Sequence, residues 1–169
     1  FKTPVTIEGQ VAGTIPDKIN LSNLSIKSDL TVATGNIVLD GTTLDATLAG
    51  RVPEFKPLLD TASGAVTYSL KAGGDLSALA LSANLNAPAI DMAGRGLSDL
   101  AVALNATADP KAPKAQVKAT GKIDGQAIDI STDVLSEGGQ TTLPSIKANV
   151  GNNSLTGHVA LSESFAPTG

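Results

Sequence analysis

The stretch LALSANLNAPAIDMAG, residues 79–94, decides the fold because its first nine residues alternate strictly in character. Apolar side chains occupy every second position: Leu79, Leu81, Ala83, Leu85 and Ala87. Successive side chains of a β-strand point to opposite faces of the sheet, so this alternation predicts a strand with one apolar and one polar face. Pro88 cannot donate to a strand ladder, and we expect the strand either to stop there or to carry a bulge.

The same alternation recurs along the chain and predicts about ten or eleven strands in all. Clear examples are TTLDATLAG at 42–50, LAVAL at 100–104 and PSIKANV at 144–150. The apolar positions shift phase between Leu21 and Leu24. Turn residues are expected to separate strands at Asp40-Gly41, Gly73-Gly74, Asp124-Gly125, Gly138-Gly139 and Gly151-Asn152.

The segment RVPEFKPLLDTA, residues 51–62, departs from this alternation. Phe55, Leu58 and Leu59 have helical spacing, but Pro57 would limit or kink a helix. Two interpretations stand equal here: a short helix near 53–61, or a loop that packs its three apolar residues.

Composition narrows the class of protein. Hydrophobic residues make up 41% of the 169 residues, which is too many for a disordered chain, yet aromatic residues make up only 2%. The net charge is −4, with no basic run and few rings for base stacking, so nucleic acid is not an expected partner. There is no Cys, so disulfides and thiolate metal sites are excluded within these residues.

The apolar face of such a chain needs a cover or a ligand. Two sheets can stack, one sheet can close into a barrel, or one sheet can curl around a hollow. A sandwich core must be filled densely, which is hard with alanine at many inward positions and so few rings. Small residues would also let two sheets approach closely, so composition leaves both the sandwich and the hollow sheet open.

Residues 73–110 combine a Gly-ended strand, an alternating run closed by Ala-Pro, and a Gly-x-x-Leu-x-x-Leu step. These features, with KATGKIDGQAIDIST, LPSIKANVGNNSLTGHVALS and the VPEFKPLL stretch, resemble repeats of the TamB family (translocation and assembly module B), within the wider AsmA-like group. The resemblance covers most of the chain, more firmly from residue 43 onward.

The resemblance implies an all-β fold, an elongated curled sheet (a β-taco or open half-pipe) with an apolar concave face and at most one short helix near 53–61. Residues 1–169 are then expected to be one β-rich segment of a longer repeat protein, with sub-units 1–50 and 63–169 joined by 51–62. The implied location is the periplasm of a Gram-negative cell envelope, with an inner-membrane anchoring helix outside this segment.

The function implied by the resemblance is conduction of phospholipids between inner and outer membrane along a hydrophobic groove, in support of outer-membrane biogenesis. The implied partners are phospholipid acyl chains and an outer-membrane assembly protein of the barrel-insertase type, without a cofactor. Two other functions fit the same pattern. One is a scaffold that binds β-strand clients during outer-membrane protein assembly, and the other is a surface β-sandwich domain of the adhesin kind.

Groove residues are expected on the apolar phase of the strands, where each buried CH₂ of an acyl chain contributes about 0.8 kcal/mol without polar contacts. For each of them, ordinary core packing is the competing interpretation. The candidates are Leu79, Leu81, Leu85, Ile90, Met92, Leu100, Val102, Leu104, Val117, Ile123, Ile128, Ile130, Ile146, Val150, Leu155, Val159 and Leu161.

Catalysis is not expected. His158 is the only histidine, and it falls on the polar phase of GHVAL, out of step with Val159 and Leu161. No nucleophile elbow is present, and the aspartates are spread over turns and polar phases. The sequence therefore predicts neither catalytic residues nor a metal site.

Overall fold

The computed structural model describes residues 4–15, 17–110, 112–137, 140–161 and 167–168, and these residues contain no helix. Their strands form one antiparallel sheet of 13 strands. The strands are β1 (Thr6–Thr14), β2 (Lys18–Lys27), β3 (Val32–Asp40), β4 (Thr43–Val52), β5 (Ala62–Gly64), β6 (Val66–Asp75), β7 (Leu79–Met92), β8 (Arg95–Ala108), β9 (Lys114–Ile123), β10 (Gln126–Glu137), β11 (Gln140–Val150), β12 (Asn153–Leu161) and β13 (Pro167–Thr168).

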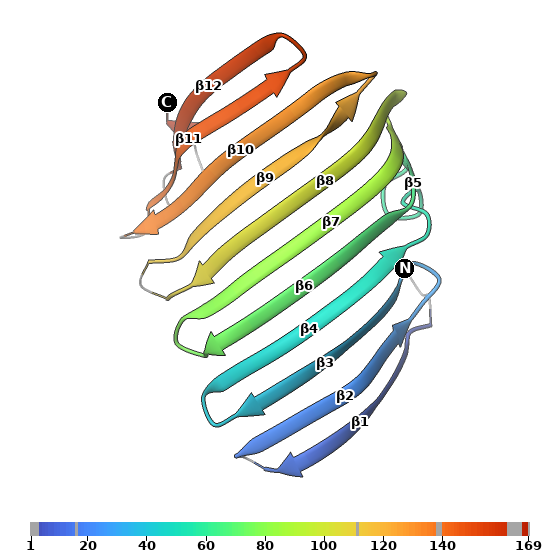
Figure 1. Cartoon of the computed structure of the whole chain (residues 1–169), viewed down its shortest axis with the longest axis vertical. Coiled ribbons are helices and arrows are strands. Elements are labelled where there is room, and N and C mark those ends of the chain that lie inside the picture. The colour runs from blue at the N-terminus through green and yellow to red at the C-terminus, as the bar shows by residue number, and fades with distance from the viewer. Residues whose placement is uncertain (1–3, 16, 111, 138–139, 162–166, 169) are drawn as a thin grey trace.

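The strands lie side by side in chain order, in a single twisted layer from β1 to β12 (Figure 1). β4 pairs with β6 across the intervening loop, and the short β5 pairs with β7 at one margin. The sheet does not close on itself, because β1 and β13 end it without pairing to each other. The predicted all-β, open half-pipe is thus confirmed. The alternative of a two-sheet sandwich is wrong, because every described strand belongs to one sheet.

The register aligns apolar positions of successive strands into rows across the sheet. Cross-strand partners point to the same face, so alternation within each strand becomes one apolar face of the whole sheet. Lys71, Ser82 and Asn105 are partners on the opposite, polar face. The central row of the apolar face is Leu24, Gly35, Leu48, Leu70, Ala83, Leu104, Val117, Thr132 and Ile146.

Bulges keep the apolar side chains on this face where the sequence changes phase. Asn23, with a φ of 53°, lies where the pairing of β2 shifts, so Leu21 and Leu24 face the same side. Asp99, with the same φ, is the extra residue of β8. Pro88 lies opposite it inside an unbroken β7. Residues 86–90 of β7 lie opposite residues 64–67, which are one residue fewer, so β7 does not stop at Pro88 and the bulge alternative is confirmed.

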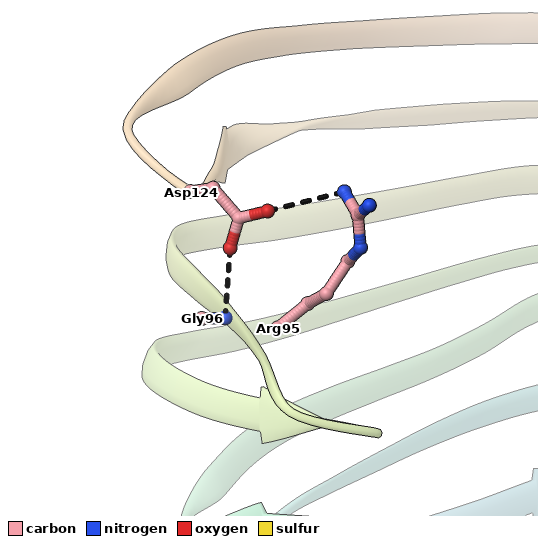
Figure 2. Close-up of polar contacts among 3 residues, drawn as sticks. All are labelled: Arg95, Gly96 and Asp124. Carbon is pink, nitrogen blue, oxygen red and sulfur yellow. Dashed lines mark hydrogen bonds and ion pairs between the residues drawn. The ribbon is translucent and has the colours of Figure 1, made fainter.

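Two predicted hairpin turns are confirmed at Asp40-Gly41 and Asp124-Gly125. The Asp124 carboxylate accepts a hydrogen bond from the Gly96 N–H and pairs with the Arg95 guanidinium at 3.1 Å, which ties this hairpin to the start of β8 (Figure 2). A third predicted turn is confirmed at Gly151-Asn152, and Gly138-Gly139 lies outside the described residues.

The predicted turn at Gly73-Gly74 is wrong, because both glycines continue β6 and pair with β4. The chain turns after Asp75 instead. The Asp75 carboxylate accepts hydrogen bonds from the Ser77 N–H and hydroxyl and from the Thr42 hydroxyl. A carboxylate with three donors thus fixes this turn and joins it to the neighbouring β3–β4 turn.

Residues 53–61 form a loop, here called the Phe55 loop, and the helix alternative is wrong. The N–H groups of Leu58 and Leu59 donate to the Phe55 carbonyl, which makes one turn. The turn does not extend toward the N-terminus as a helix, because Pro57 has no N–H to donate to the Pro53 carbonyl four residues earlier. Of the three apolar side chains only Phe55 packs on the sheet, while Leu58 and Leu59 remain 45% and 43% exposed.

Candidate functional site

The apolar face carries every groove residue predicted from the sequence, from Leu79 in β7 to Leu161 in β12. Each is the cross-strand partner of another apolar position, or stands in phase with one along its strand. In the described part of the chain no second sheet lies on this face. Leu70, near the middle of the sheet, is therefore 42% exposed.

This face is hollowed where it crosses β2 to β8. We call this hollow, which has a volume of about 490 Å³, the apolar trough. Short methyl side chains at Ala46, Ala72 and Ala83 leave the space between longer neighbours. The apolar lining consists of Leu24, Ile26, Ile37, Ala46, Leu48, Leu70, Ala72, Leu81, Ala83 and Leu104.

The predicted groove residues divide into three sets on this face. Leu81 and Leu104 line the trough. Leu85, Ile90 and Leu100 belong to a packed cluster at its margin. The remaining predicted residues lie on the apolar face outside both, at Leu79, Met92, Val102, Val117, Ile123, Ile128, Ile130, Ile146, Val150, Leu155, Val159 and Leu161.

The prediction omits the trough residues that precede β7, such as Leu24, Ile37, Leu48 and Leu70. Their own alternation in residues 19–50 and 66–72 carried the necessary signal. Which positions form the trough depends on cross-strand register, which periodicity alone does not give.

The Phe55 loop covers the apolar face at one margin, beside β5 (Figure 1). Phe55 packs with Val66, Ala87 and Ile90, which are 2%, 1% and 7% exposed. The loop is closed by hydrogen bonds: the Glu54 carboxylate accepts from the Lys56 and Gly64 N–H groups, at 3.0 and 2.9 Å. These bonds lower the pKa of Glu54. These hydrogen bonds fix the loop that carries Phe55 over the buried cluster.

Tyr68 stands between the trough and this covered cluster. It is the cross-strand partner of Gly50, and a Cβ added to Gly50 would lie 2.6 Å from the ring carbon Cζ. The ring therefore lies over the glycine, an arrangement that covers exposed backbone. Its hydroxyl is 3.0 Å from Thr31 Oγ1, which in turn donates to the Arg51 carbonyl.

Most charged groups act at turns and strand pairs, and Arg95, the cross-strand partner of Met92, lies at the margin of the apolar face. Three ion pairs, Lys18–Asp40, Arg95–Asp124 and Lys122–Asp99, are exposed, and such pairs contribute only about 0–1 kcal/mol each. Hydrogen bonds from Ser77 and Thr42 lower the pKa of Asp75 to about 2. The carboxylates of Asp75 and Asp124 accept hydrogen bonds from groups at or beside the turns, which is a structural role.

The potential metal ligands of the described residues stand apart from one another. His158 is exposed on the polar face of β12. Within the described ranges no three His, Asp or Glu side chains gather closely enough to hold a metal ion. The same residues contain no helix with the length and apolar character to cross a membrane.

Comparison with known proteins yields no match to a family model, to a curated protein or to a solved structure.

Proposed function

We propose that the apolar face binds phospholipid acyl chains, as part of an envelope protein that carries these lipids between inner and outer membrane. The observation that supports the proposal is a continuous apolar face with a trough, over which no second sheet lies among the described residues. Sheets normally bury such a face against another element, so an uncovered one indicates an apolar ligand. The periplasmic setting and the two membranes come from the TamB resemblance.

The expected affinity of the trough is low, which suits a moving ligand. A methylene group buried on all sides contributes about 0.8 kcal/mol, and one resting on an open face about half of that. About ten methylenes would then contribute about 4 kcal/mol, which corresponds to a Kd on the order of a millimolar. Leucine and alanine give no directional contacts, so an acyl chain can slide from one strand to the next.

A photo-crosslinking experiment tests this proposal. The 169-residue chain is irradiated with a diazirine-labelled decanoate, and the modified residues are mapped by mass spectrometry. We expect crosslinks on the apolar face, centred on Leu48, Leu70 and Leu104, and few on the polar face. Excess unlabelled decanoate should remove them.

Leu104→Asp is the informative variant, and Asn105→Asp is its matched control on the opposite face. Both add one carboxylate to neighbouring positions of β8. Leu104→Asp should reduce crosslinking by about tenfold, since the loss of two or three methylene contacts is worth about that much, and should stop lipid passage in cells. Asn105→Asp should change neither. Equal crosslinking of the two faces, or equal loss with both variants, would refute acyl-chain binding.

A second candidate function, binding of β-strand clients, is favoured by the edge strand β1. All nine residues of β1 are exposed, and the strand contains no Pro or Lys, the residues that commonly protect an edge. An extended client peptide could add to this edge by main-chain hydrogen bonds. A proline substitution at Gln10 would block this pairing and leave decanoate crosslinking unchanged, which separates the two functions.

A further inference from the structure

The apolar face has two zones that differ sharply in exposure. Leu70, in the trough, is 42% exposed, whereas Val66, four residues earlier in the same strand, is 2% exposed. Phe55 packs on the cluster of Val66, Ala87 and Ile90, together with apolar side chains of the neighbouring strands. Four residues of a strand span about 13 Å, so an open zone and a covered zone lie within one strand length.

Two aromatic side chains mark the boundary between the zones. Tyr68 lies midway between Leu70 and Val66 on the same face of β6, and its ring extends over Gly50 toward Thr31. Phe55 lies on the far side, above the buried cluster. The loop that carries Phe55 is fixed at its base by the Phe55 N–H bond to the Gly64 carbonyl, at 2.8 Å, and by the Glu54 carboxylate.

We propose that Phe55 and Tyr68 are positioning residues that confine an apolar chain to the central row and keep it off the strand ends at Val66 and Ile90. This inference rests on the proposed function. An apolar ligand on an unbounded face would have equivalent paths along and across the strands. The two rings remove the path along β6 and β7 at one margin, so the ligand runs across the strands, from Leu24 through Leu48 to Leu104.

The crosslinking experiment with diazirine-labelled decanoate tests this, with the position of the crosslinks as the readout. In the unmodified chain, crosslinks should fall on Leu48, Leu70 and Leu104 and be at least about tenfold fewer on Val66, Ala87 and Ile90. In Phe55→Ala, crosslinks on Val66, Ala87 and Ile90 should increase about tenfold, which is equivalent to about two newly contacted methylene groups. Phe55→Leu, which keeps an apolar cover, should leave the distribution close to that of the unmodified chain.

Tyr68→Ala supplies a second variant that leaves the loop intact, and Tyr68→Phe is its control because the ring remains. Tyr68→Ala should extend crosslinks to Gly50 and Val52, and Tyr68→Phe should not. An unchanged distribution in both alanine variants, or crosslinks at Val66 and Ile90 already equal to those at Leu70 in the unmodified chain, would overturn this inference while leaving acyl-chain binding intact. Absence of any crosslink on the apolar face would instead overturn the proposed function itself.

Discussion

A charge placed on the apolar face should cost very different amounts of stability in its two zones. Leu70 is 42% exposed and Ile90 is 7% exposed. Burying a leucine fully contributes about 1.5–3 kcal/mol, so Leu70→Asp loses about 1–2 kcal/mol of burial and up to about 1 kcal/mol of strand propensity. Its carboxylate stays hydrated, and the total loss should be about 2 kcal/mol.

Ile90→Asp buries an unpaired carboxylate beside Phe55, Val66 and Ala87. Loss of the isoleucine contacts, the cavity and the charge together should cost about 5 kcal/mol or more, a large part of the total stability of a typical domain. Leu70→Ala and Ile90→Ala remove the side chains without adding charge. They should cost about 1 and about 3 kcal/mol.

Urea unfolding followed by far-ultraviolet circular dichroism measures these differences. Leu70→Asp should fold, and its free energy of unfolding should be lower than that of Leu70→Ala by about 1 kcal/mol. If Leu70→Asp unfolds the chain, as expected for Ile90→Asp, the trough is covered in solution and is not free for a ligand. If both aspartate variants cost the same, the division of the face into two zones is wrong.

Three further predictions concern the turns and the boundary of the trough. The pKa of Asp75 is lowered from 3.8 to about 2, so its stabilisation is complete above pH 3.8 and is lost as the pH falls toward 2. The urea midpoints of the unmodified chain and Asp75→Asn should therefore converge over that interval, and a constant difference would contradict the assignment. Gly50→Ala should lower the free energy of unfolding by about 1–3 kcal/mol, because its Cβ meets the Tyr68 ring at 2.6 Å, and urea unfolding that shows no loss would contradict this packing. Asp124→Ala should speed hydrogen exchange of the Gly96 amide by about fivefold, since one hydrogen bond of about 1 kcal/mol is lost; unchanged exchange would show that the bond is absent in solution.

The strands and their shared face were predictable from the sequence because each follows from alternation. Leu79 to Ala87 and Leu100 to Leu104 are in phase within their own segments, and antiparallel neighbours must place such phases on one side. The shift from Leu21 to Leu24 is also visible in the sequence, and Asn23, a residue that tolerates positive φ, absorbs it.

The two zones of the face were not predictable in this way. Leu70 and Val66 are both apolar and in phase along β6, yet one is open and the other is buried by Phe55. That contact joins a loop to Ala87 and Ile90, more than thirty residues later, and no local pattern encodes such a distance. The helical spacing of Phe55, Leu58 and Leu59 also allowed a helix. In the structure the Phe55 carbonyl accepts hydrogen bonds from Leu58 and Leu59, which form only a single turn.

Each strand in this sheet touches only the strands beside it, and almost all of these are its neighbours in sequence. The stability of such an array is approximately a sum of hairpin terms and nearest-neighbour terms, as in repeat proteins. Unfolding should therefore begin at the two end strands, β1 and β13, and reach the cluster under Phe55 last. A hairpin inserted between two neighbouring strands in the β9–β12 region would replace one strand interface with three and leave the others intact. Each added strand lengthens the sheet by about 4.8 Å, so this architecture can be fitted to a required span by whole hairpins without redesigning a core.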